Sequence, residues 1–236
     1  MTGIDALKRA AAARALESVR DGMVLGLGTG STIRFFLDLL GERVRAGNLS
    51  AVVGVPTSRR TAEIARGHGI RVSRLRAQPR LDLTVDGADE VDPRGNLIKG
   101  LGGALLREKI VAQASDRFIV IVDESKAVER LGTRSPLPVE VTRFGSSSHQ
   151  AFVAALGAEV AMRRAADGSR YVTSNGNYIL DARFPEGIED PAALDGALRA
   201  RAGIVENGLF LGMTTRALIA APGGVRERTA APGDIR

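Results

Sequence analysis

A short acidic run contains four carboxylates, Asp86, Asp89, Glu90 and Asp92. It directly follows the apolar segment 81–85, which we expect to be a buried strand. Ligands of open α/β sheets bind beyond the carboxyl ends of strands, so these side chains are placed to hold a polar molecule. Carboxylates this close repel one another unless they bind something or face water. A solvated acidic turn and a Mg²⁺ site are therefore open alternatives, although the spacing is not that of an EF-hand loop.

A glycine-rich loop at 26–32 stands between a predicted strand and a predicted helix. Backbone N–H groups of such a turn can approach an anion closely, and the helix dipole adds to the attraction. The loop lacks the third glycine of a dinucleotide fingerprint, no acidic residue occurs in 54–58 after the next strand, and no P-loop lysine follows. The hydroxyls of Thr29, Ser31 and Thr32 favour a polar ligand over a simple tight turn.

Lys99 stands at the mouth of a second glycine-rich loop, which opens a predicted helix that contains Glu108. An exposed helical face is the alternative for Glu108 and its neighbour Lys109. Lys126 follows the apolar run 118–122, which is another predicted strand.

Three apolar strands, 23–27, 81–85 and 118–122, thus each end in a polar loop. In a parallel sheet those loops share one edge, which predicts a single site built from 28–32, 86–89, 99–108 and 126. Lysines, carboxylates and glycine loops without a cofactor motif suit proton transfer on an anionic small molecule.

The composition excludes several other chemistries. The 236 residues include no cysteine and only two histidines, His68 and His149, so zinc chemistry and a histidine-based triad are not expected. No apolar run has membrane-spanning length, and basic residues interrupt the first twenty positions. We therefore expect a soluble, cytoplasmic protein without a membrane partner.

The net charge of +6 raises nucleic acid as a partner. The densest basic stretch spans 59–80 and reads either as a solvated surface or as an anion or oligomer surface. No aromatic residue is interleaved with it, so stacking on a nucleic acid is not supported. The four lysines, at 8, 99, 109 and 126, all lie at or beside positions tied to the candidate site.

Predicted strands and helices alternate along the chain up to about residue 130. This rhythm predicts α/β architecture with a parallel sheet and right-handed crossovers. Residues 131–206 have a different rhythm, with a helix at 150–156, a hairpin at 159–174 and a further helix from Asp190, which is typical of a small α+β domain. Pro136, Pro138 and the serines at 146–148 indicate connections between elements. We expect this domain to be inserted into a main domain made of 1–130 and 207–236.

At these residues the chain resembles ribose-5-phosphate isomerases of type A. The shared motifs occur in family order: GLGTGST (26–32), DGADE (86–90), KGLGGALLREK (99–109), the lysine of DESK (123–126), PLPVEV (136–141), NGN (175–177) and GLF (208–210). The family usually reads KGGGAAL where this chain has Leu101 and Gly103. Because leucine adopts a positive φ only at a cost, the path of this loop is left open.

The resemblance implies a Rossmann-like domain with an α+β insert, a dimer or tetramer, and interconversion of D-ribose 5-phosphate and D-ribulose 5-phosphate without metal or coenzyme. It implies that Glu108 is the catalytic base, that Lys99 stabilises the enediolate oxyanion, and that Asp86 assists ring opening. The implied substrate-binding residues are Lys8, Thr29, Gly30, Ser31, Thr32, Asp86, Gly87, Ala88, Asp89, Lys99, Gly100, Leu101, Gly102 and Lys126.

Rival interpretations are a sugar-phosphate deaminase, a CoA transferase, and a non-catalytic protein that binds a sugar phosphate or nucleic acid. A deaminase would need an active-site histidine, and neither His68 nor His149 falls in a motif loop. A CoA transferase would be longer and would carry a glutamate nucleophile in its own motif.

Overall fold

The computed structural model describes residues 3–229 of the chain, which divide into two compact units. The first contains the described parts of 1–88, 107–127 and 212–236. The second contains 89–106 and 128–211. The predicted insert, 131–206, lies inside the second unit, which also takes in the hairpin region 89–106.

The first unit is built on a seven-stranded sheet with the order β14-β13-β7-β4-β1-β2-β3. Its strands are β1 (Val24–Leu27), β2 (Val53–Pro56), β3 (Arg71–Val72), β4 (Leu83–Asp86), β7 (Phe118–Asp123), β13 (Arg216–Ala221) and β14 (Gly224–Thr229). All neighbours pair in parallel except the terminal hairpin of β13 and β14. Every residue of β7 is buried, as expected for an apolar strand covered on both faces. The predicted α/β class is confirmed.

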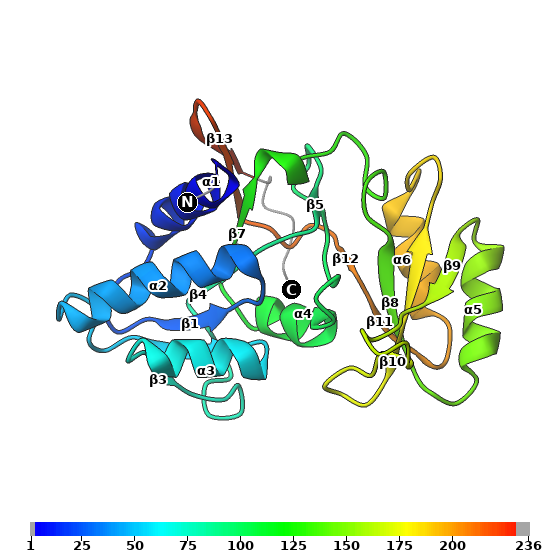
Figure 1. Cartoon of the computed structure of the whole chain (residues 1–236), viewed down its shortest axis with the longest axis horizontal. Coiled ribbons are helices and arrows are strands. Elements are labelled where there is room, and N and C mark those ends of the chain that lie inside the picture. Colours follow the sequence, from blue (N-terminus) through cyan, green and yellow to red (C-terminus); the bar gives the residue numbers. More distant parts are fainter. Residues whose placement is uncertain (1–2, 230–236) are drawn as a thin grey trace. The chain divides into compact units, whose positions relative to one another are not determined.

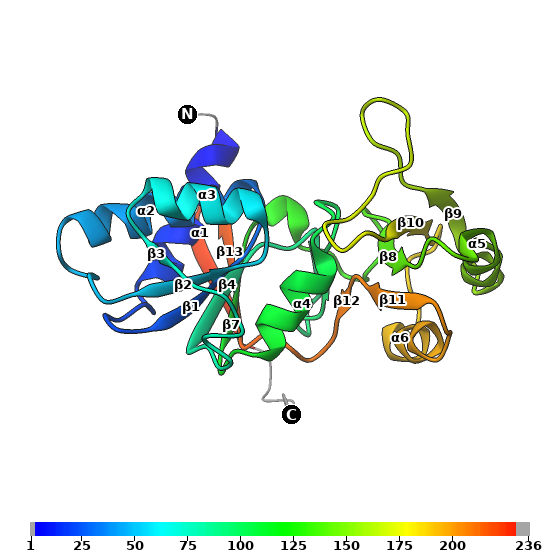
Figure 2. The same cartoon turned by 90° about the horizontal axis from the view of Figure 1, so that it is seen from below.

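Helices cover both faces of this sheet. They are α1 (Gly3–Leu16), α2 (Ser31–Arg45), α3 (Arg59–Gly67) and α4 (Leu105–Gln113), of which α4 enters this unit at residue 107. Figure 2 shows α2 and α3 together on one side of β1 and β2. On the other side a Cβ at Gly26 would lie 2.7 Å from the Val111 side chain of α4, so only glycine permits this close approach. No helix in the described range is long and apolar enough to cross a membrane.

The second unit contains a four-stranded antiparallel sheet with the order β11-β8-β10-β9 and a three-stranded sheet with the order β12-β6-β5 (Figure 1). The strands are β5 (Glu90–Val91), β6 (Leu97–Ile98), β8 (Leu137–Val141), β9 (Glu159–Met162), β10 (Tyr178–Arg183), β11 (Ile204–Asn207) and β12 (Leu209–Phe210). Helices α5 (Ser146–Ala155) and α6 (Pro191–Arg199) pack against these strands, around a core separate from that of the first unit. A short 3₁₀ helix, η1 (Glu124–Lys126), follows β7 in the first unit.

Two predictions for the insert are wrong. The serines at 146–148, expected in a connection, form the first turn of α5. Residues 170–174, expected as the second strand of a hairpin, make only one isolated bridge, between Arg164 and Arg170. The chain does not continue as a paired strand here, because the Thr173 hydroxyl donates to the buried Glu140 carboxylate at 2.9 Å.

Candidate active site

The glycine loop joins β1 to α2 and packs tightly against Asp86 at the end of β4. The Gly28 N–H donates to the carbonyl of Val85 at 3.0 Å. A Cβ at Gly28 would lie 2.0 Å from Asp86 Oδ1, so no side chain fits there. Gly30 has φ +136°, which favours glycine, and the next residue begins α2. The sequence therefore needs glycine at these two positions for different reasons.

Asp86 is fully buried at this edge of the sheet. Its Oδ1 atom accepts hydrogen bonds from the backbone N–H groups of Thr29, at 3.1 Å, and Gly87, at 2.7 Å. These donors compensate the charge of a carboxylate removed from water. The half-buried Gly87 and Ala88 continue the chain from this point.

The Thr29 side chain belongs to a cluster of hydroxyl groups. Its Oγ1 lies 2.7 Å from that of Thr57, 2.9 Å from that of Ser58 and 3.1 Å from that of Thr61. Thr61 Oγ1 in turn donates to the Gly28 carbonyl at 2.9 Å. The cluster fixes the loop to the start of α3. Ser58 also caps α3, because its Oγ accepts from the Thr61 N–H at 3.1 Å.

The N-terminus of α2 is accompanied by a lysine from α1. Lys8 Nζ donates to Ser31 Oγ at 3.0 Å, and Ser31 and Thr32 form the first turn of α2. A helix N-terminus, two hydroxyls and an ammonium group together form an electropositive corner that suits a phosphate.

Glu108 is only 4% exposed and its neighbour Lys109 only 1%. Both lie on α4, so the alternative of an exposed helical face is wrong for this pair. Burial protects the Glu108 carboxylate from bulk water, which suits an acid–base group.

Lys126 is half-buried and ends η1, directly after β7. The Asp123 carboxylate organises this turn by accepting from the Ser125 N–H at 3.0 Å. Because β1, β4 and β7 are consecutive parallel neighbours, the loops after them lie along one edge of the sheet, as predicted.

In the second unit, Asp89 and Leu101 are joined by a hydrogen bond. The Leu101 N–H donates to Asp89 Oδ2 at 3.0 Å, and the Asp89 N–H donates to the Ile98 carbonyl at 2.8 Å. Gly100 has φ +107° and Gly103 has φ +76°, whereas no described residue other than glycine has a positive φ. The glycines thus take the unusual conformations, and Leu101, followed by the exposed Gly102, needs none.

Lys99 precedes this loop and is 3% exposed. Its N–H donates to the Gly208 carbonyl at 2.9 Å, and its Nζ lies 5.5 Å from the centre of the Phe210 ring. An ammonium group over an aromatic face is stabilised by a cation–π interaction. The GLF segment therefore fixes Lys99 through its backbone and its ring.

Two side chains that hold the 99–103 loop were not expected from the sequence. Arg163 Nη1 donates to the carbonyls of Gly100, at 2.9 Å, and Leu101, at 3.0 Å. Its guanidinium is also paired with Asp181, and the Tyr171 hydroxyl packs against the loop where a Cβ at residue 103 would stand. The sequence carried no signal for these contacts, since an arginine about sixty positions away has no spacing to reveal it.

The remaining acids of the run are structural. Glu90 is fully buried and accepts from the backbone N–H groups of Gly132, Arg134 and Ser135 at 2.5–2.7 Å. Asp92 Oδ1 accepts from two N–H groups of the 94–96 turn. Because these acids and Asp86 are buried, a solvated acidic turn is wrong. Within 3–229 no group of three or more histidines or acids is arranged to hold a metal ion.

The buried Glu140 explains two of the shared motifs. Its Oε1 accepts from Thr173 and from the side-chain amides of Asn175, at 3.1 Å, and Asn177, at 2.9 Å. The PLPVEV and NGN segments are thus joined by one carboxylate within the second unit.

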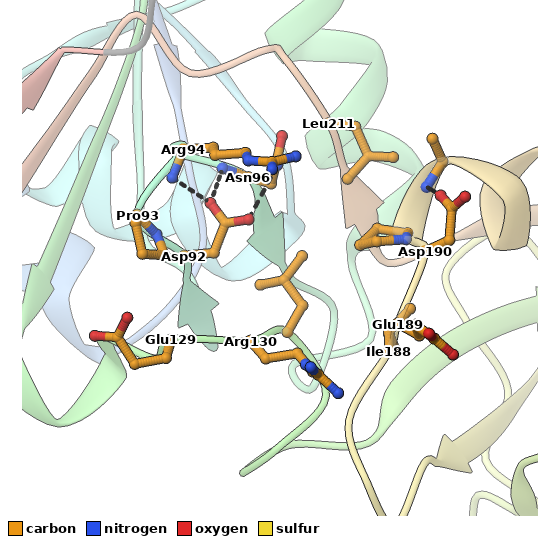
Figure 3. A pocket seen from close by; sticks show the side chains of 13 residues that line it. Asp92, Pro93, Arg94, Asn96, Glu129, Arg130, Ile188, Glu189, Asp190 and Leu211 are labelled. Carbon is orange, nitrogen blue, oxygen red and sulfur yellow. Dashed lines mark hydrogen bonds between the residues drawn. The ribbon is translucent and has the colours of Figure 1, made fainter.

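A cavity of about 390 Å³ in the second unit contains none of the predicted site residues (Figure 3). Two of its carboxylates hold backbone: Asp92 closes the 92–96 turn, and Asp190 Oδ1 accepts from the N–H groups of Ala192 and Ala193 at 3.0 Å to cap α6. This cavity is therefore lined by residues that maintain the fold and by none of the predicted site residues.

Comparison with known proteins decides the family. The family model of Ribose 5-phosphate isomerase A (phosphoriboisomerase A) matches residues 53–224. Ribose-5-phosphate isomerase A from Synechococcus sp. (strain JA-3-3Ab) is 51% identical over 226 residues, which cover 95% of this chain and 97% of that one. The chain belongs to the ribose 5-phosphate isomerase A family. The Roseiflexus castenholzii relative is 54% identical over 220 residues, 93% of this chain and 94% of that one.

Solved structures of ribose 5-phosphate isomerases have the same fold. One, a complex with phospho-erythronic acid, has a TM-score of 0.93 at 38% identity and covers 97% of this chain and all of that one. The Plasmodium falciparum enzyme has a TM-score of 0.92 at 37% identity, covering 96% and 99%. The ribose 5-phosphate isomerase motif at 99–103 contains Leu101 in this chain. Gly100 and Gly103 supply the positive φ angles of its loop, and Arg163 holds it by hydrogen bonds.

Proposed function

We propose that this chain interconverts D-ribose 5-phosphate and D-ribulose 5-phosphate in the non-oxidative pentose phosphate pathway. The observation that carries the proposal is the buried Glu108 carboxylate, in a chain about half identical to ribose-5-phosphate isomerases over nearly its full length. The relatives and solved structures described above are all isomerases, which favours catalysis over a non-catalytic binding protein.

The reaction needs one base that moves a proton between two carbons. Glu108 removes the proton from C2 of the open-chain aldose, and the C1 carbonyl becomes an oxyanion of a cis-enediolate. The proton returns at C1, the C2 oxygen becomes the ketone carbonyl, and its hydroxyl proton passes to O1. General base catalysis contributes about 10²–10⁴-fold, so stabilisation of the oxyanion must supply much of the rest. We assign that role to Lys99.

The other site residues bind and open the sugar. Asp86, whose Oδ1 is held by two backbone donors, and Asp89, held by Leu101, take sugar hydroxyls and assist ring opening. The phosphate lies at the N-terminus of α2, with Lys8 supplying charge. Lys126 contributes to substrate binding from the loop after β7.

The phospho-erythronic acid bound by one solved relative fits this chemistry. It is a four-carbon acid phosphate, and its carboxylate places two oxygens on one carbon with negative charge, as the enediolate spreads charge over two adjacent oxygens. We expect it to inhibit this chain in competition with substrate, because complementarity to the enediolate is what catalysis requires.

We further propose that the enzyme is a cytoplasmic homodimer or homotetramer that needs no metal. The proposal rests on the resemblance to the ribose 5-phosphate isomerase A family. The test is ketopentose formation from ribose 5-phosphate by the purified chain in excess EDTA, with sedimentation to measure its mass. Turnover lost in EDTA and restored by Mg²⁺ would contradict the metal-free reaction, and no turnover in either buffer would contradict the isomerase.

A further inference from the structure

A second cavity, of about 310 Å³, lies in the first unit between α3, α4 and the segment after β3. Four of its thirteen lining residues are arginines, Arg59, Arg66, Arg74 and Arg107, and none is acidic. The cavity in the second unit has four acids beside two arginines. Of these two cavities, the one between α3 and α4 has only positive charges in its lining, and it lies where the basic stretch 59–80 meets α4.

The lining arginines come from separate elements that face one another. Arg59 and Arg66 stand at i and i+7 on α3 and share one helical face with Ala62. Arg107 lies on α4, and Arg74 lies in the segment after β3. Four guanidinium groups around one space repel one another, and a bound anion relieves that repulsion.

Three of these guanidinium groups are not used by the fold. The side chains of Arg59, Arg66 and Arg74 make no hydrogen bond or ion pair with any other residue of the described range 3–229. Elsewhere in the same basic stretch Arg80 pairs with Asp116 at 2.8 Å, and Arg71 donates to the Ala51 carbonyl at 2.8 Å. Arg59, Arg66 and Arg74 thus keep their side-chain donors for a molecule that enters the cavity.

The rest of the lining is apolar. Val55, Val72, Leu75, Ile110 and Val111 contribute to it, and Ile110 is 43% exposed although it is a large aliphatic residue. Ligand pockets of about 300–1,000 Å³ with apolar walls and a few convergent polar groups are typical of small-molecule sites. An inorganic anion would bind to the arginines but would leave the apolar lining residues exposed to water.

We propose that this cavity binds a small organic phosphate, with the phosphate among the arginines and its apolar body against Ile110 and Leu75. The planar, five-donor fork of arginine matches phosphate oxygens in pairs, and each paired contact is stronger than a neutral hydrogen bond. The site is separate from the proposed substrate phosphate position at Lys8 and Ser31. It uses no residue of the proposed catalytic machinery.

The test uses the full chain, phenyl phosphate as the probe, and the methyl NMR signal of Ile110 as a position-specific readout. We expect a saturable shift of that signal, with an affinity about tenfold higher than for inorganic phosphate, since that is what 1.4 kcal/mol of added apolar contact gives. No saturable shift at millimolar phenyl phosphate overturns the proposal. Equal affinities for the two probes overturn the role of the apolar walls.

Arginine variants locate the phosphate. Arg66→Ala combined with Arg74→Ala is expected to weaken phenyl phosphate binding about tenfold or more, because two charge-assisted contacts are lost. The matched control is Arg60→Ala, on the same helix but outside the cavity lining, which is expected to change affinity less than about twofold. An equal loss in the control would show general charge attraction and overturn the site. Unchanged methyl spectra elsewhere and unchanged isomerase turnover show that the double variant is folded.

Discussion

The backbone N–H of Thr29 donates to Asp86 Oδ1 at 3.1 Å and so joins the glycine loop after β1 to the end of β4. The two residues are 57 positions apart in the sequence. Their contact depends on Gly28, where a Cβ would lie 2.0 Å from the same oxygen. One small residue thus sets the position of both a proposed sugar-binding carboxylate and the start of the proposed phosphate site.

Gly28→Ala is expected to separate the loop from Asp86. The added methyl must displace a fully buried carboxylate, and overpacking of this kind costs about 1–3 kcal/mol of unfolding free energy. We expect kcat/KM to fall more than about a hundredfold, since small displacements of positioned groups are costly. Gly67→Ala is the control, because a Cβ there meets nothing within 4 Å. Equal effects of the two variants on thermal unfolding and kinetics would contradict this account of Gly28.

Lys8→Ala is expected to raise KM for ribose 5-phosphate about tenfold or more, because one charge-assisted contact to phosphate is lost. The effect should grow at low salt, where screening is weak. Arg9→Ala is the matched control: its guanidinium lies 3.6 Å from Glu42 on the surface, and KM should stay within about twofold. If steady-state kinetics give the same KM for the Lys8 variant as for the unaltered chain, the phosphate does not lie at α2.

Arg163→Lys tests the support of the Lys99 loop. A lysine cannot donate to two carbonyls and to Asp181 with the fork geometry that Arg163 uses, so the loop should lose its fixed path. We expect kcat to fall about tenfold to a hundredfold with a smaller change in KM, as for other supporting residues around a reacting group. Arg164→Lys is the control, since among the described residues the Arg164 side chain donates only to the Gly168 carbonyl, in its own turn. A KM change without a kcat change would show that the loop binds substrate and does not organise catalysis.

The pair of Arg216 and Glu227 tests the terminal hairpin. The Nε and Nη2 atoms of Arg216 each donate to the Glu227 carboxylate at 2.6 Å. These hydrogen bonds lower the pKa of Glu227 below its usual range. A lowered pKa means stability that is present above the pKa of the unfolded chain and is lost as the pH falls through that of the folded one. Glu227→Gln should therefore reduce the free energy of unfolding by up to about 1 kcal/mol at pH 7 and by less in acid. Urea unfolding at both pH values measures this, and a difference that grows in acid would contradict it.

The sequence was sufficient for the parallel strands of the first unit, because they are apolar runs that alternate with helices. It did not predict β14, whose residues are mostly exposed and polar. It also placed the loops after β1, β4 and β7 on one edge, since parallel strands share their carboxyl ends. It missed β8, where Pro138 indicated a connection: proline lacks the ladder donor, yet its carbonyl still accepts from the Gly208 N–H at 2.8 Å. The sequence also did not predict that Glu108 and Lys109 are buried, because an Arg-Glu-Lys sequence on a helix is typical of a solvent-exposed face.

The loop at 99–103 shows the same limit. Its glycines were visible in the sequence, and Leu101 raised the question of its path. The answer depends on Arg163 and Tyr171, which come from a distant part of the second unit. Contacts between segments so far apart leave no periodic pattern in a single sequence.

Proton exchange with solvent measures whether Glu108 moves a proton between C2 and C1. Ribose 5-phosphate is incubated in D₂O with the unaltered chain or with Glu108→Gln, and conversion and deuterium incorporation are followed by ¹H NMR. The unaltered chain should form ribulose 5-phosphate with deuterium at C1. The variant should neither convert nor exchange the substrate, while it still binds phospho-erythronic acid. Turnover or exchange by the variant at a near-normal rate would contradict the assignment of Glu108 as the base.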